Sequence, residues 1–147
     1  MNVWAKRYFS YFLSLSLVTV IQVYILDIPT FISQAPDLVN EYYRKNAISS
    51  FIFDFFLLLI YFSVGMYFAD FLNINKNDNA GQLLALIMSS MTISGAFMVY
   101  FLSRKVSKSF FSRWFHRIGV KAVFYDVILV SSVYTLMMII HQKIYGK

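Results

Sequence analysis

Three aspartates stand within or at the end of long apolar stretches, where carboxylates are rare. Asp27 closes the first stretch, Asp54 lies about two turns into the second, and Asp126 lies about one turn into the fourth. If the stretches cross a membrane alternately, all three lie near the same membrane edge. Tyr61 falls on the same helical face as Asp54. The sequence therefore predicts a polar intramembrane cluster of Asp27, Asp54, Asp126 and Tyr61.

Such a cluster is compatible with three kinds of chemistry. The carboxylates could be structural, hydrogen bonded to hydroxyl or backbone groups or paired with Arg44, Lys45 or Lys121. They could bind a cation or a proton, or they could act as metal ligands or general acids. A carboxylate at mid-membrane costs about 2.5–3.5 kcal/mol on insertion scales, so Asp54 and Asp126 are expected to face protein or water. Without a local motif, the structural interpretation is favoured and the other two stay open.

The sequence contains no motif that would name a reaction. It has no glycine-rich phosphate loop, no His-Glu-x-x-His and no Gly-x-Ser-x-Gly. It has no cysteine, which excludes disulfides, iron–sulfur clusters and cysteine-ligated zinc. His116 and His141 fall in polar segments expected on opposite sides of the membrane, which disfavours a shared metal site. We therefore expect no enzymatic activity, no cofactor and no metal centre.

The composition indicates an integral membrane protein. Hydrophobic residues make up 59% of the 147 residues and charged residues 14%, against about 25% charged in soluble domains. Four apolar stretches are each long enough to cross a hydrocarbon core of about 30 Å. The sequence predicts an all-α, multi-pass fold, a four-transmembrane-helix bundle in a single membrane domain over residues 1–147. It does not indicate which cellular or viral membrane holds the protein. The predicted spans are residues 8–28, 47–72, 81–102 and 122–140.

Small residues recur along the third stretch at spacings of three and four. They are Gly81, Ala85, Ser89, Thr92 and Ala96. A stripe of small side chains lets a second helix approach closely, which is how helices pack where lipid removes the hydrophobic drive between them. The sequence predicts a helix-packing interface here, with packing inside the bundle favoured over an interface between molecules.

The net charge of +6 is concentrated before the fourth stretch. Six of the thirteen basic residues lie between residues 104 and 121, opposite aromatic residues at helical spacing. This pattern predicts a basic amphipathic interfacial helix over about residues 105–118. No soluble nucleic-acid module accompanies the charges, so nucleic acid is not an expected partner. Contacts with anionic lipid headgroups are expected from Lys105, Lys108, Arg113, Trp114, Arg117 and Lys121.

The connection between the first and second stretches is also expected to be helical. Residues 36–45 begin with proline, carry acids early and bases late, and so suit a short interfacial helix. Lysines and arginines number eight on the side of the first and third connections and five on the other side. The positive-inside rule then predicts both termini outside the compartment of synthesis.

The layout resembles an uncharacterised family of small four-span membrane proteins of bacteria and large DNA viruses. Asp27 late in the first stretch, Tyr42-Tyr43 before the second and Asp126 within residues 123–127 match that family's pattern over nearly the whole chain. The family's Tyr-Asp-x-Thr-Asn-like pattern is replaced here by residues 89–94 in the third stretch. The resemblance implies the four-span fold, and it implies no activity because the family's function is not established.

Two functional hypotheses follow. Short connections, no soluble domain and no catalytic motif favour a structural or assembly subunit of a larger membrane complex, whose partners are lipids and other membrane subunits or further copies of itself. The alternative is a small oligomeric ion- or proton-coupled transporter or channel that uses the intramembrane aspartates.

Overall fold

The computed structural model of the protein describes residues 2–146. Within this range the chain is helical and contains no strand. Four helical segments there are long and apolar enough to cross a membrane. The fold is therefore an all-α bundle of four membrane-spanning segments, as the sequence predicts. The segments are α1 with η1 (Val3–Val18 and Thr19–Ile25), α4 (Ala47–Phe71), α5 (Asn79–Leu102) and α7 (Val120–Tyr145).

The first span begins and ends earlier than residues 8–28. Asn2 caps α1, and its side chain accepts a hydrogen bond from the amide of Ala5 at 2.8 Å. The helix continues without a break into the π-helical segment η1. It stops before Asp27, whose backbone adopts a left-handed conformation (φ 49°) and turns the chain into α2 (Ile28–Ser33). Asp27 thus belongs to the turn after the span and not to the span itself.

Short helices form both longer connections. Residues 36–45 form α3 (Pro36–Asn40) and the π-helical turn η2 (Glu41–Lys45), where a short helix was expected. The amphipathic helix is α6 (Phe110–Ile118), which is shorter than the predicted 105–118 because Ser109 caps it and accepts a hydrogen bond from the amide of Ser112 at 3.3 Å. Gly119, with φ 53°, lets α7 start directly after α6.

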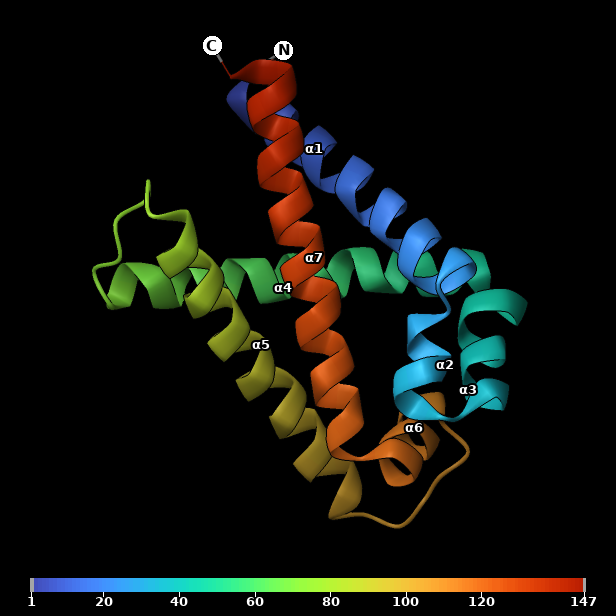
Figure 1. The fold of residues 1–147 in the computed structure, drawn as a ribbon. Helices are drawn as coiled ribbons and strands as arrows, with labels where there is room; N and C mark the ends of the chain where they lie inside the picture. The colour runs from blue at the N-terminus through green and yellow to red at the C-terminus, as the bar shows by residue number, and fades with distance from the viewer. Residues whose placement is uncertain (1, 147) are drawn as a thin grey trace.

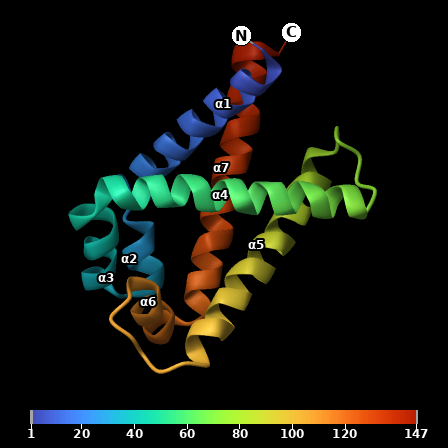
Figure 2. The same cartoon turned by 180° about the vertical axis from the view of Figure 1, so that it is seen from behind.

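The long helices cross one another obliquely. Figure 1 shows α4 lying across α7, and the view from behind in Figure 2 shows the same crossing. The first turns of α1 and the last turns of α7 lie together, where the Lys6 ammonium is 5.1 Å from the centre of the Tyr145 ring. The short helices α2, α3 and α6 gather at the other end of α7, beside the end of α5 (Figure 1). This end holds most of the aromatic and charged contacts described below.

The crossing of α4 and α5 depends on a glycine. A Cβ atom built on Gly65 would lie 2.8 Å from Cδ1 and 3.1 Å from Cα of Leu86, so the leucine side chain would have to move and the backbone contact would be unusually tight. The backbones can approach only because Gly65 has no side chain. This close approach fixes the direction in which the preceding turns of α4, including Asp54 and Tyr61, face.

Polar side chains hold α1 in place. Tyr11 donates a hydrogen bond at 2.7 Å to the carbonyl of Phe55 in α4. Gln22 donates to the hydroxyl of Ser132 in α7 at 2.7 Å, and Ser10 lies 3.5 Å from the ring of His141. Because these groups lie within an apolar bundle, each hydrogen bond also orients the helix that carries it.

Candidate functional site

A cavity of about 130 Å³ lies where α4, α5, α6, α7 and η2 meet. Seventeen residues line it, and eleven of them are aromatic. Two of the others are Asp54 and Asp126; the remaining four are aliphatic. No lysine, arginine or histidine of residues 2–146 lines it. The cavity is thus an aromatic chamber with two carboxyl groups in its wall.

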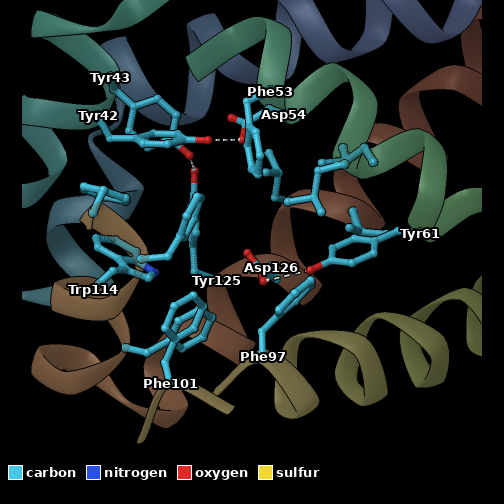
Figure 3. Close-up of a pocket in the computed structure, with 17 residues that line it drawn as sticks. Tyr42, Tyr43, Phe53, Asp54, Tyr61, Phe97, Phe101, Trp114, Tyr125 and Asp126 are labelled. Atoms are coloured by element: carbon cyan, nitrogen blue, oxygen red, sulfur yellow. Dashed lines mark hydrogen bonds between the residues drawn. The ribbon is translucent and has the colours of Figure 1, made fainter. Parts of the chain in front are cut away.

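Asp54 enters the cavity from α4. It lies on the buried face of that helix, which also carries Ser50, Leu58, Tyr61 and Gly65 at spacings of three and four. Its side chain is 6% exposed, and Oδ1 accepts a hydrogen bond from the Tyr42 hydroxyl at 2.6 Å. Figure 3 shows this contact across the upper part of the cavity. The other oxygen, Oδ2, accepts no hydrogen bond within residues 2–146.

Asp126 enters the same cavity from α7. Its Oδ2 accepts hydrogen bonds from the Ser94 hydroxyl of α5 at 2.5 Å and from the Tyr61 hydroxyl of α4 at 3.3 Å. One carboxyl group therefore joins three spans. Figure 3 shows Asp126 beside the Tyr61 hydroxyl and the ring of Phe97. Hydrogen bonds to a carboxylate lower the cost of burying its charge but do not neutralise it.

The turn η2 brings two neighbouring tyrosines to the cavity. The hydroxyl groups of Tyr43 and of Tyr125 in α7 lie 2.6 Å apart, in hydrogen-bond contact. Tyr24 of η1 donates a hydrogen bond to the backbone carbonyl of Tyr43 and so secures the turn. Burial raises the pKa of both Tyr42 and Tyr43 above its ordinary value, so both remain protonated donors at neutral pH.

Helix α6 covers the cavity with its apolar face. Trp114 and Phe115 are buried, and both line the cavity. The ring of Phe110 stacks on those of Tyr42 and Trp114, with centroids 4.8 and 5.7 Å apart. The ring of Phe101 in α5 stacks on that of Phe115 at 5.5 Å. The apolar face that the sequence assigned to the headgroup layer thus closes the cavity.

Two ion pairs join the outer face of α6 to the segment of α3 and η2. Both guanidinium NH₂ groups of Arg113 donate to the Glu41 carboxylate, at 2.7 and 2.6 Å. Arg117 donates to Asp37 at 2.6 Å. The hydrogen bond from Arg113 lowers the pKa of Glu41, and the same bond raises the pKa of Arg113. We call α6 with these two ion pairs the lid.

The structure brings together three of the four residues of the predicted polar cluster. Asp54, Asp126 and Tyr61 line the cavity, and Asp27 does not. Asp27 is half-buried in the turn before α2, and its side chain makes no capping hydrogen bond there. The prediction placed it by its depth along the first span, but the span ends before it.

The small-residue stripe of α5 packs only in part. Ala85 and Ser89 are buried and Gly81 is half-buried, but Thr92 and Ala96 are exposed. The face that packs inside the bundle runs instead through Ala85, Leu86, Ser89, Ser90 and Ser94. The helix is oriented by the contact of Leu86 with Gly65 and by the bond from Ser94 to Asp126, which turn Thr92 and Ala96 outward.

The residues predicted at the lipid headgroups divide into two groups. Lys105, Lys108, Arg117 and Lys121 are exposed. Trp114 is buried at 7% exposure, so its assignment to the headgroup layer is wrong: its ring belongs to the cavity wall. Arg113 is half-buried, and its guanidinium is bound to Glu41.

Several cavity residues were not singled out as site residues from the sequence. Tyr125 supplies a hydroxyl group to the cavity wall, and Phe97, Phe101 and Phe110 supply rings. Ser94 does not line the cavity, but its hydroxyl donates a hydrogen bond to Asp126. Tyr125 directly precedes Asp126, and neighbouring residues of a regular helix can line the same cavity. This adjacency was a signal by which Tyr125 could have been predicted. The position of Phe97 depends on the path of α5 past α7, which no local pattern encodes.

The donor set limits the chemistry of this cavity. Within residues 2–146 no group of three or more histidine, cysteine, aspartate or glutamate side chains is placed to hold a metal ion. The available groups are two carboxyls, neutral hydroxyls and aromatic faces, which together can bind a positively charged group.

No protein-family model, no curated protein and no solved structure matches this chain. The four apolar spans define a multi-pass membrane protein, and the cavity between them is its candidate site.

Proposed function

We propose that this multi-pass membrane protein binds a cation in the cavity and acts as a small ion- or proton-coupled transporter or channel. One observation carries the proposal: Asp54 and Asp126 line the same cavity within the spans, and no basic side chain of the described residues 2–146 lines it. Burying an ionisable side chain within a membrane span costs free energy, and such residues characteristically mark ion or proton pathways. A bound cation or proton would neutralise the two carboxylates.

The partners of the two carboxyl groups support this proposal. Both accept hydrogen bonds from hydroxyl groups, which remain neutral. A purely structural pair would be expected to carry its own counter-charge, because an unpaired buried charge is costly. Exchange of protons and cations at one carboxyl pair is also the simplest basis for coupled transport.

The test is cation-dependent proton movement in liposomes that contain the purified protein. An imposed gradient of a monovalent cation should move protons through the wild type but not through the double variant Asp54→Asn/Asp126→Asn. Asp70→Asn is the matched control, since Asp70 is exposed near the opposite end of α4. Equal proton movement by the wild type and the double variant, with both correctly inserted, would refute the proposal.

A structural or assembly role is a second candidate, and one observation favours it. Thr92 and Ala96 face outward on α5, so the outer part of the small-residue stripe is open to another helix. The native mass in mild detergent separates the two roles. Recovery with different proteins would favour a subunit of a larger complex, whereas a discrete homo-oligomer would favour transport. Thr92→Leu should disrupt either assembly without unfolding the monomer.

The exposed bases before the fourth span are proposed to contact lipid. Lys105, Lys108 and Lys121 have exposed side chains beside the spans, where anionic headgroups attract cations by about 1 kcal/mol each. This proposal predicts that replacing all three by glutamine weakens binding of the protein to anionic lipid in mixed micelles.

A further inference from the structure

We propose that the ligand of the cavity is a small organic ammonium ion. This inference rests on the proposed cation-binding function and names its ligand class. The cavity combines a wall that is mostly aromatic with two carboxyl groups, and this combination suits a cation that carries methyl or methylene groups better than it suits a bare metal ion.

The aromatic wall is the first reason. Eleven of the seventeen lining residues carry aromatic rings. The face of such a ring attracts a cation within about 6 Å, and the attraction is strongest for cations that are weakly hydrated. Alkylammonium groups lose little hydration on entry, and their carbon atoms contact the rings directly.

The oxygen donors give the second reason. Hard metal cations require about six oxygen ligands at short distances. Here the Oδ2 atom of Asp126 already accepts two hydrogen bonds, and the Oδ1 atom of Asp54 accepts one. An alkylammonium ion needs only a nearby negative charge, which both carboxylates supply without giving up these hydrogen bonds.

The size and stiffness of the cavity agree with such a ligand. Its volume of about 130 Å³ is close to that of a cavity of about 150 Å³ that admits benzene. The ring of Phe110 stacks on those of Tyr42 and Trp114, with centroids 4.8 and 5.7 Å apart. Because the rings hold one another in place, their side chains lose little conformational entropy when a ligand binds.

The protein contains a reporter at the cavity. Its two tryptophans are Trp114, which lines the cavity, and Trp4, which is 66% exposed at the far end of α1. In a Trp4→Phe background, Trp114 is the sole indole. Titration with tetramethylammonium should give a saturable change in its fluorescence. Potassium and the neutral tert-butanol, which has a similar size, should give none over the same concentration range.

Substitutions separate the contributions of charge and rings. Asp54→Asn and Asp126→Asn should each weaken tetramethylammonium binding by about tenfold or more. Phe97→Leu should weaken it by about twofold to fivefold, because one ring face is lost. Phe97 is 44% exposed at the cavity, so this change leaves the core intact. The control is Phe56→Leu, since Phe56 is 59% exposed on α4 and does not line the cavity.

The outcomes distinguish the ligand class from the cation-binding function. Saturable binding of tetramethylammonium that depends on Asp126 and Phe97 supports both. Potassium binding that depends on the aspartates, with no effect of Phe97→Leu, overturns the organic ligand and leaves cation binding standing. Equal binding of tert-butanol and tetramethylammonium, or no binding of any probe, overturns both.

Discussion

Two pairs of acidic residues, one in the lid and one in the cavity wall, have opposite kinds of partners. Asp37 and Glu41, in the connection before α4, are bound by Arg117 and Arg113. Asp54 and Asp126 lie inside the spans, and in the part of the chain that the structure describes their side-chain partners are all neutral hydroxyl groups. The protein thus places arginine on the two acids outside the spans and withholds it from the two acids that line the cavity.

This difference teaches which acids are structural and which are available for a ligand. An arginine partner neutralises the charge and fixes the geometry, and near water it adds little stability. A hydroxyl partner orients the carboxyl group and leaves its charge to be balanced by something else. We infer that the two outer ion pairs, of Asp37 and Glu41 with arginine, hold α6 over the cavity. The inner pair, Asp54 and Asp126, is available to bind a positively charged group.

The largest expected effect is on stability, at the hydrogen bond between Tyr43 and Tyr125. Tyr43→Phe would leave the buried Tyr125 hydroxyl unpaired and should lower the free energy of unfolding by about 1–3 kcal/mol. The double variant with Tyr125→Phe should lose less than the sum of the two single variants, because no hydroxyl is then left unpaired. Chemical unfolding in mixed micelles, followed by circular dichroism, measures these values.

The matched comparison for this prediction is Arg117→Gln at the outer ion pair. The side chains of Arg117 and Asp37 are 50% and 61% exposed, so their loss should barely change the unfolding transition. If Arg117→Gln destabilised the protein more than Tyr43→Phe, the ion pair of Arg117 with Asp37 would not be the weakly stabilising contact that its exposure predicts.

The sequence predicted the fold class because hydrophobic length is a local property. Each of the four segments found in the structure overlaps a predicted span. The span ends were less predictable: the cap at Asn2 and the left-handed turn at Asp27 moved the first span toward the N-terminus. The resemblance to a family of four-span proteins stays a prediction.

The site was only partly predictable from the sequence. The depth of a residue in the membrane is easier to derive than the direction in which its side chain points around the helix axis. Periodicity placed Asp54 and Tyr61 on one face of α4, and the structure brings both to the cavity. The same reasoning misplaced Trp114, since an amphipathic helix can bury its apolar face against lipid or against protein with the same pattern. The surface that it covers here is defined by contacts between distant segments, such as the stacking of Phe110 on Tyr42 and of Phe115 on Phe101.

An intermediate effect is expected when the lid is loosened. The chain has no cysteine, so Leu129→Cys introduces a single thiol in the cavity wall. Adding Arg113→Gln should speed the reaction of this thiol with a water-soluble maleimide by about twofold to fivefold, the effect of losing one partly exposed ion pair. Arg104→Gln is the control, because Arg104 lies over Tyr100 and makes no ion pair with the segment of α3 and η2. Equal rates in all three proteins would show that the ion pairs do not control access.

The smallest expected effect is a pH dependence of the lid. The hydrogen bond from Arg113 lowers the pKa of Glu41. A carboxyl group whose pKa is lowered on folding contributes stability that is complete above its ordinary pKa of about 4.3 and is lost as the pH falls through the lowered value. Quenching of Trp114 by acrylamide, in the Trp4→Phe background, should therefore stay constant from about pH 7 to about pH 5 and rise in more acidic solution.

Glu41→Gln should show the higher quenching at every pH, because its lid lacks the ion pair with Arg113 throughout. Asp37→Asn should keep the acid-dependent rise, since it leaves the pair of Glu41 with Arg113 intact. A rise that persists unchanged in Glu41→Gln would assign the pH dependence to a group other than Glu41.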